Sequence, residues 1–177
     1  SSDLNLFRGV KKPGGPTGAV DKALGGVITQ LIEDGEIKGS TGETTLIHTL
    51  GKIKPSRVLV AGLGTQDKFD VQVVRRVSAE VVRFLRRKGI SSAATIAHGA
   101  GIGGLDPQSS GQAIAEGAHL GLYKFGTYLT KDSDSTNEFE RLTVVELDKT
   151  RAKAIEAGVK LGSTVAKASI TARNMVN

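Results

Sequence analysis

Strand-like and helix-like segments alternate along this chain, and this alternation constrains the fold more than any other feature. Residues 57–61 are almost continuously apolar, which is typical of a strand covered on both faces. Residues 70–88 follow with apolar side chains at helical spacing, and Gly89 ends that segment. Because alternating elements favour helices packed on a sheet, the sequence predicts a three-layer α/β sandwich with a mixed sheet.

We expect core strands and flanking helices at defined places. The strands lie near residues 44–50, 57–61, 93–97 and 141–147, and the helices near 17–34, 70–88, 107–123 and 150–174. Thr17 is expected to cap the first helix. Gly25 and Gly26 lie inside that helix, where such a pair indicates close approach of another backbone. The first ten residues resemble the tail of another strand, cut from a longer sequence.

Composition excludes several classes of protein. The chain has no cysteine, which rules out disulfides, thiolate nucleophiles and zinc–sulfur sites. No apolar run approaches the roughly 18 residues of a membrane helix, and the first residues lack the regions of a signal peptide. We therefore expect a cytoplasmic protein with no membrane partner.

The charge leaves nucleic acid open as an alternative partner. The 24 basic and 18 acidic residues give a net charge of +6, a modest excess for a nucleic-acid-binding protein. Two tyrosines and five phenylalanines offer few rings for stacking bases. Five arginines decorate one predicted helix, and they indicate a solvated face or a face paired to another subunit: Arg75, Arg76, Arg83, Arg86 and Arg87.

One glycine-rich motif suggests a phosphate-binding loop. Residues 99–104 satisfy G-x-G-x-x-G between a predicted strand and a predicted helix. The candidate phosphate-binding residues are Gly99, Gly101, Gly103 and Gly104. However, the helix begins only after Asp106, whose carboxylate would repel a phosphate, and no acidic residue follows at the dinucleotide-binding position. These two observations favour a purely structural loop, and a phosphate-binding loop remains the alternative.

The residues alone identify no catalytic group and no metal ligand. His48, His98 and His119 are widely separated, and no H-E-x-x-H motif occurs among them. In strand patterns, His48 and His98 are explained by a core or edge position. A serine nucleophile would need an elbow such as G-x-S-x-G, and the sequence contains none.

Several segments, taken together and in order, resemble the leucine aminopeptidase (cytosol aminopeptidase) family. They are residues 21–26 (DKALGG), 35–39 (GEIKG), 42–51 (GETTLIHTLG), 57–64 (RVLVAGLG), 116–125 (EGAHLGLYKF), 142–146 (LTVVE) and 172–177 (ARNMVN). The resemblance implies an N-terminal α/β domain similar to the macrodomain fold, followed by a C-terminal catalytic domain. That catalytic domain would hold two divalent cations, zinc or manganese, in motifs resembling N-T-D-A-E-G-R.

No such motif occurs in this chain, so no catalytic or metal-binding residue of the family can be assigned here. The resemblance implies the non-catalytic N-terminal domain of a leucyl aminopeptidase that hydrolyses N-terminal residues from peptides. The domain would serve assembly of a hexamer and access of the substrate, and would be inactive alone. An autonomous phosphate, nucleotide or nucleic-acid-binding module remains the alternative.

The resemblance also divides the chain. We assign residues 1–150 to the N-terminal α/β domain, with a truncated start, and residues 151–177 to a connector helix toward the catalytic domain. The late part of that helix is small and polar, whereas a helix that faces its own core throughout carries larger side chains to its end.

Overall fold

A five-stranded mixed sheet forms the centre of the computed structural model, which describes residues 2–99, 103–123 and 138–176. Its strand order is β2-β3-β1-β4-β5, and only β2 runs antiparallel to its neighbour. The strands are β1 (Ser2–Phe7), β2 (Thr44–His48), β3 (Arg57–Gly64), β4 (Ser92–Ile96) and β5 (Arg141–Val145). The expected strand tail at the beginning of the chain is therefore the central strand.

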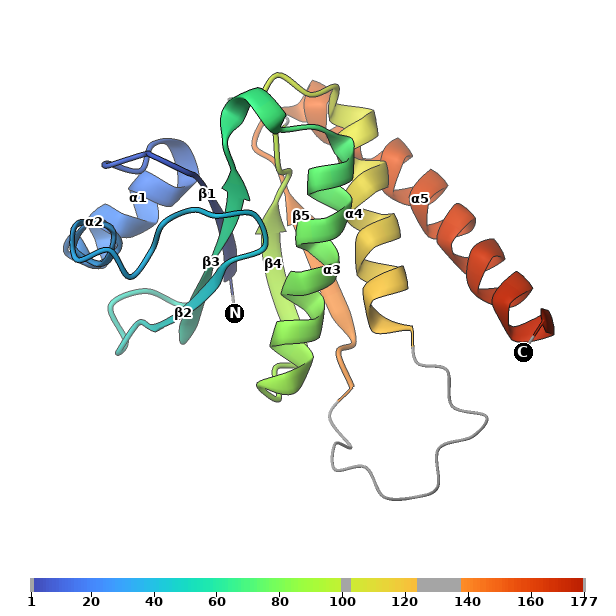
Figure 1. The fold of residues 1–177 in the computed structure, drawn as a ribbon, viewed down its shortest axis with the longest axis horizontal. Coiled ribbons are helices and arrows are strands. Elements are labelled where there is room, and N and C mark those ends of the chain that lie inside the picture. The colour runs from blue at the N-terminus through green and yellow to red at the C-terminus, as the bar shows by residue number, and fades with distance from the viewer. Residues whose placement is uncertain (1, 100–102, 124–137, 177) are drawn as a thin grey trace.

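Helices cover both faces of this sheet, which confirms the three-layer sandwich (Figure 1). The helices are α1 (Gly15–Ala23), α2 (Val27–Glu33), α3 (Val71–Arg87), α4 (Pro107–Leu122) and α5 (Lys149–Val176), with a short 3₁₀ turn η1 (Gln66–Lys68). Helices α1 and α2 pack on one face, α3 and α4 pack on the other, and α5 packs on α4. None of the described helices has both the length and the apolar character needed to cross a membrane.

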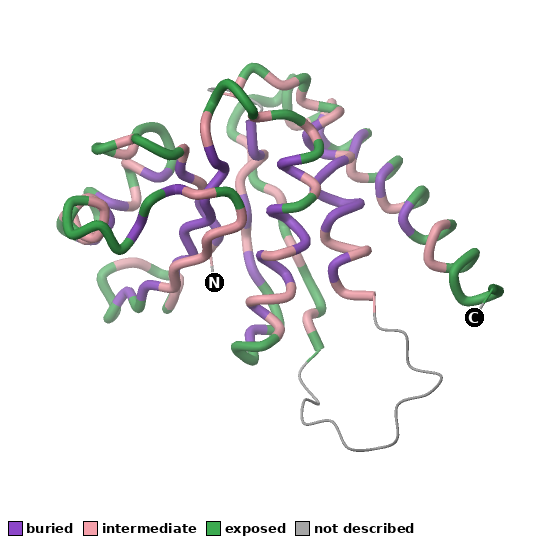
Figure 2. Tube along the Cα trace, in the orientation of Figure 1, coloured by how far each residue is buried: buried purple, intermediate pink, exposed green. Residues whose placement is uncertain are grey.

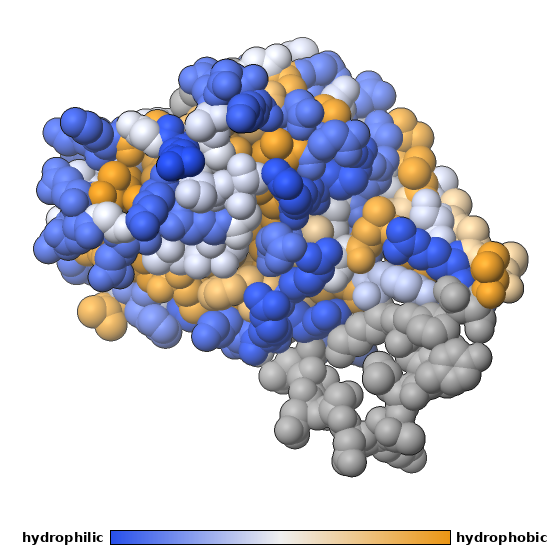
Figure 3. All heavy atoms as spheres, in the orientation of Figure 1, coloured by the Kyte–Doolittle hydropathy of each residue, from blue (hydrophilic) through white to orange (hydrophobic). Residues whose placement is uncertain are grey.

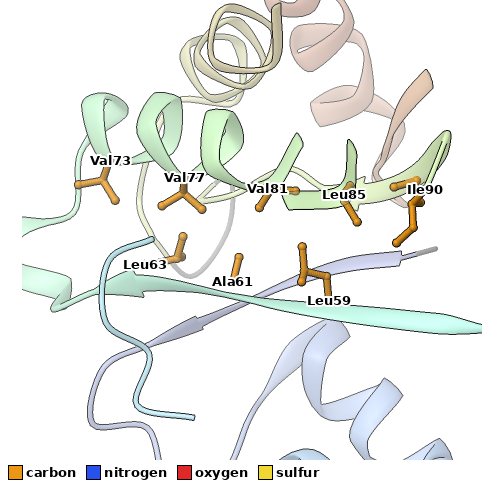
Figure 4. Close-up of a cluster of buried hydrophobic side chains, with 9 residues drawn as sticks. Leu59, Ala61, Leu63, Val73, Val77, Val81, Leu85 and Ile90 are labelled. Carbon is orange, nitrogen blue, oxygen red and sulfur yellow. The ribbon is translucent and has the colours of Figure 1, made fainter. Parts of the chain in front are cut away.

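Strand β3 lies between two apolar clusters. Val58 and Val60 contact the cluster beneath α1 and α2, whereas Leu59 and Leu63 contact the cluster beneath α3. Figure 4 shows the second cluster, in which side chains from one stripe of α3 point toward the strand. All residues of β3 after Arg57 are buried, as predicted for a strand covered on both faces.

The expectation of one helix over residues 17–34 is wrong, because the chain forms two helices there. The break falls at Gly25 and Gly26, which have φ angles of +79° and +84°. A Cβ at Gly26 would meet nothing within 4 Å, so this glycine serves the left-handed turn rather than a close contact.

Side chains near this break also differ from expectation. Thr17 does not cap α1, because it lies inside the helix and its hydroxyl donates to the carbonyl oxygen of Asn5 at 2.8 Å. Asp21 instead holds the start of α2, since its Oδ1 accepts from the N–H groups of Ile28 and Thr29 at 2.7 and 3.1 Å. The carboxylate thereby satisfies donors that a helix start leaves free.

Helix α5 contacts α4 through a seam of small residues, which we call the glycine seam: Gly111 on α4, with Gly158 and Gly162 on α5. A Cβ at Gly158 would overlap the carbonyl oxygen of Gln108, and one at Gly162 would overlap that of Gln112. The two backbones therefore touch directly. Beyond Ala166 no residue of α5 is buried, and Figure 2 shows its last turns exposed.

Candidate functional site

A pocket of about 700 Å³ opens at the carboxyl ends of the parallel strands β1, β4 and β5. Much of its wall comes from residues 5–7 of β1, residues 96–97 at the end of β4 and residues 145–147 around the end of β5. Residues 12–17, which precede α1 and form its first turn, make another part. The volume falls within the range of about 300–1,000 Å³ that is usual for small-molecule sites.

The topology explains why the pocket lies at this edge. Strands β1 and β4 are parallel neighbours, but the chain leaves β1 toward α1 on one face and leaves β4 toward α4 on the other (Figure 1). The two connections therefore diverge and leave a crevice. In open α/β sheets, ligands bind at such a switch point.

The pocket wall is largely apolar with a cationic rim. Two cations line it, Lys12 and Arg151, together with the carboxylate of Glu146. Arg151 lies 3.7 Å from Glu146 Oε1 and 4.0 Å from Asp148 Oδ2, so its charge is shared with carboxylates. Lys12 is exposed and makes no ion pair with any described residue. An anionic group in the pocket would therefore find its least compensated cation at Lys12.

A buried polar cluster lies beside the pocket. His98 Nε2 is 3.3 Å from Asp3 Oδ2, and the Thr95 hydroxyl donates to the same oxygen at 2.8 Å. His98 Nδ1 is 3.1 Å from the amide nitrogen of Asn5, which itself lines the pocket. Asp3 and His98 are only 2% and 1% exposed. The cluster thus connects the interior of the sheet to the pocket wall.

The predicted glycine loop contributes to the same pocket. Gly99 and Gly103 line it, Gly104 has a φ of +67° without lining it, and Gly101 lies outside the described residues. A Cβ at Gly99 or at Gly103 would approach the Phe69 ring to 2.5 or 2.6 Å. The ring therefore requires glycine at both positions whether or not a ligand binds.

The helix that follows this loop is already capped. Asp106 Oδ2 accepts from the N–H and the hydroxyl of Ser109 at 2.8 and 2.9 Å. The same backbone and side-chain bonds lower the pKa of the Asp106 carboxyl. Because a carboxylate occupies the start of α4, a phosphate would have to meet the glycine loop from the pocket instead.

The structure does not bring the three histidines together. His48 is exposed at the end of β2, whereas His98 is buried beside β1. His119 lies on α4, 3.3 Å from the hydroxyl of Ser163 on α5, and burial together with the nearby Lys167 lowers its pKa. Within residues 2–99, 103–123 and 138–176, no three His, Asp or Glu side chains lie close enough to share a metal ion.

The arginines of α3 have a structural use that the sequence did not indicate. Arg75 forms an ion pair with Glu116 of α4 at 2.6 Å. Arg83 and Arg86 donate to the carbonyl oxygens of Gly121 and Leu122 at 3.3 and 3.0 Å. Although Figure 3 shows hydrophilic side chains over much of this face, three of the five arginines bind α4 and hold it against α3.

The residues of the buried cluster are far apart in the sequence, and no motif marks them as a group. The available signal is the pattern of β1, where Asp3 and Asn5 alternate with Leu4 and Leu6 in the central strand. Polar side chains in such a strand need partners, and the fold supplies them from residues more than 90 positions away.

Comparison with known proteins shows which family this chain is similar to. The model of the cytosol aminopeptidase family, N-terminal domain, matches residues 6–132. A probable cytosol aminopeptidase of Alkaliphilus oremlandii is 32% identical over 174 residues, which cover 98% of this chain and 35% of that protein. The chain thus spans about a third of the length of this relative.

Solved structures agree on the fold. A mutant of tomato leucine aminopeptidase matches with a TM-score of 0.72 and 17% identity, over 99% of this chain and 34% of that one. A Trypanosoma brucei macrodomain in complex with ADP-ribose matches with a TM-score of 0.66 and 15% identity, over 88% and 61%. The sequence matches and the shared fold lead to one conclusion: this chain belongs to the cytosol aminopeptidase family and corresponds to its N-terminal domain.

Proposed function

We propose that this chain is the non-catalytic N-terminal part of a cytoplasmic leucyl aminopeptidase, which hydrolyses N-terminal residues from peptides. The observation that carries the proposal is the coverage of the relatives. The match to the Alkaliphilus protein spans nearly all of this chain but only 35% of that protein. In this proposal the other two thirds of the relative correspond to the catalytic domain.

Two divalent cations, zinc or manganese, belong to that catalytic domain in the proposal. The described residues of this chain do not fit such a centre, because their carboxylates and imidazoles form no cluster of three potential ligands. A two-metal site needs several such side chains around each ion. We therefore derive no hydrolytic step from the residues of this chain.

Helix α5 supports the proposed role of residues 151–177 as a connector. Leu161 and Val165 remain 45% and 41% exposed, and Met175 and Val176 are 80% and 86% exposed. A catalytic domain packed along this helix would bury these side chains, each contributing about 1–2 kcal/mol of hydrophobic stabilisation. The domain would in addition serve hexamer assembly and substrate access.

The test compares this chain alone with a fusion that joins it to the C-terminal two thirds of the Alkaliphilus relative. Both are assayed on leucyl-p-nitroanilide with added manganese or zinc. We expect no metal-dependent turnover from the chain alone, and turnover from the fusion that a chelator abolishes. Turnover by the chain alone at the rate of the fusion would contradict the proposal.

The pocket supports a second role, the binding of a phosphate-bearing ligand. The observation in its favour is a largely apolar cavity at the switch point of the sheet, with Lys12 at its rim. Gly99 and Gly103, which line the pocket, would form one wall of the phosphate site. The macrodomain of similar fold was solved with ADP-ribose, which makes that compound the first ligand to test by calorimetric titration.

A further inference from the structure

We infer that Asn5 recognises a hydroxyl group of the pocket's ligand, and that this ligand is a nucleoside diphosphate sugar. The inference rests on the proposed ligand-binding role of the pocket and identifies the ligand class and a residue that selects it. It follows from the positions of protons in the buried cluster, from the charge at the rim and from the apolar wall.

The first step is the tautomer of His98. The Thr95 hydroxyl has a single proton, and its nearest acceptor is Asp3 Oδ2 at 2.8 Å, with the Ile96 carbonyl oxygen farther away at 3.2 Å. His98 Nε2 faces that carboxylate oxygen at 3.3 Å and the Thr95 hydroxyl oxygen at 3.4 Å. A bare Nε2 would place its lone pair against two oxygens with no proton between them, so Nε2 carries the hydrogen. In the neutral ring, Nδ1 is then an acceptor.

The second step is the orientation of Asn5. Its side-chain nitrogen lies 3.1 Å from His98 Nδ1, and since Nδ1 accepts, the amide must donate there. The reversed amide would set its oxygen against a lone pair. The Asn5 side-chain oxygen is consequently left without a partner among the described residues. Asn5 lines the pocket, and its backbone oxygen already accepts from the Thr17 hydroxyl at 2.8 Å. The side-chain oxygen is therefore the Asn5 acceptor that is available to a ligand.

The third step is the chemistry that this acceptor selects. An amide oxygen accepts from a hydroxyl or amino group, and a site built to hydrogen-bond a hydroxyl discriminates against ligands that lack it. Lys12 at the rim attracts a negatively charged group, and no acidic side chain lies in the first turn of α1 to oppose it. Glu146, the carboxylate of the wall, is shared with Arg151 at 3.7 Å.

The apolar part of the wall completes the ligand class. Leu6, Val10 and Ile96 line the pocket and suit a flat ring rather than a second charge. A ligand with a ring, sugar hydroxyls and a diphosphate uses all three kinds of surface. A free phosphate or pyrophosphate would contact only the cationic rim at Lys12. The two ligand types therefore respond differently to loss of Asn5.

The experiment titrates this chain with ADP-ribose and, separately, with inorganic pyrophosphate. We expect Asn5→Ala to weaken ADP-ribose binding about fivefold, the value of one neutral hydrogen bond, and to leave pyrophosphate binding unchanged. Lys12→Glu should weaken both ligands about tenfold. Lys11→Glu makes the same charge change one position away from the lining and should change either affinity by no more than about twofold.

A spectroscopic measurement keeps the inference testable if Asn5→Ala does not fold. In the wild-type chain, the side-chain amide resonances of Asn5 should shift on addition of ADP-ribose and not of pyrophosphate. Those of Asn174, on the exposed end of α5, should not move with either. Saturable ADP-ribose binding with unchanged Asn5 resonances, or equal weakening of both ligands in Asn5→Ala, overturns the role of Asn5 and leaves the pocket's binding function standing. No binding of either ligand to the wild type overturns both.

Discussion

Strands β3 and β5 belong to one sheet but lie in different surroundings. From Val58 onward β3 is buried between the α1–α2 layer and α3. On β5, Leu142 and Val144 pack toward α3 and α4. The other face of β5 remains exposed, and Val145 there retains 46% of its accessible surface. One half of the sheet is therefore closed on both sides, and the other half on one side.

This difference locates the site. The pocket lies at the boundary between the two halves, where the start of α1 meets the ends of β4 and β5. A sheet closed on both faces along its whole width would pack side chains into that space. The helix layer that stops at β1 thus creates the opening. Four measurements test how far the two halves differ, beginning with the largest expected effect.

Amide hydrogen exchange should separate the closed half from the end of α5. Residues 168–176 lie beyond the last buried side chain of that helix, so we expect them to open at about 1 kcal/mol. Amides of β3 should exchange only through global unfolding, at about 5–15 kcal/mol. Equal protection of the two segments, in a sample shown to be monomeric by light scattering, would mean that α5 belongs wholly to this domain and that the connector proposal fails.

Gly158→Ala tests whether the stability of the β4–β5 half of the molecule depends on the packing of α5 against α4 at the glycine seam. The new Cβ would overlap the carbonyl oxygen of Gln108, so α5 must move from α4, and we expect a loss of about 3 kcal/mol in the free energy of unfolding. Urea denaturation measures it. The control is Gly14→Ala, where a Cβ meets nothing within 4 Å. Similar unfolding midpoints for both variants would refute direct backbone contact between the helices.

A matched pair of valines compares the two halves directly. Val58 on β3 is 0% exposed and Val145 on β5 is 46% exposed. Val58→Ala should reduce the free energy of unfolding by about 2 kcal/mol because it leaves a cavity. Val145→Ala should change it by no more than about 0.5 kcal/mol. If the two substitutions reduce stability equally, the exposed face of β5 is covered in solution.

The smallest expected effect is a pH dependence of the free energy of unfolding, which arises from His119 at the contact between α4 and α5. Burial, and to a lesser extent Lys167, lowers the pKa of His119 in the folded chain, so the unfolded chain binds a proton first as the pH falls. The contribution of His119 to stability is therefore complete above about pH 6.5, its unfolded pKa, and decreases below it.

Urea midpoints at pH 7.5 and 5.5 test this expectation. The decrease between these values should be smaller in His119→Gln than in the wild type. His48→Gln, which removes an exposed imidazole from β2, is the matched control. An unaltered decrease in His119→Gln would show that this imidazole is not the group that titrates.

The elements with strong local patterns were predictable. The apolar run of β3 and the stripe of α3 specify a buried strand and a one-sided helix within a few residues of their observed ends. The break at Gly25 and Gly26 was not predictable, because the sequence of a glycine pair is the same whether it serves a close contact or a left-handed turn. The spacing of Gly158 and Gly162 did carry the signal of a close-packed helix face.

The site was less accessible to sequence reasoning. Gly99 and Gly103 were recognised and do line the pocket, yet a Cβ at either position would collide with the Phe69 ring, which lies at least 30 positions earlier in the chain. Asn5 and His98 are 93 positions apart in the chain, and only the pairing of β1 with β4 brings them together. The local pattern of β1 indicates only that Asp3 and Asn5 need partners, and it does not identify which distant residues supply them.

The glycine seam also fixes the direction in which the end of α5 projects from the domain. A helix rises about 1.5 Å per residue, so the 14 residues from Gly162 to Val176 extend about 21 Å past the last glycine contact. A tilt of about 10° at the seam would displace the tip of the helix by about 4 Å. Backbone contact leaves little freedom for such a tilt, and the Tyr123 hydroxyl holds Asn174 at 2.7 Å near the far end. The direction in which α5 carries any attached domain is therefore set by the absence of side chains at two positions.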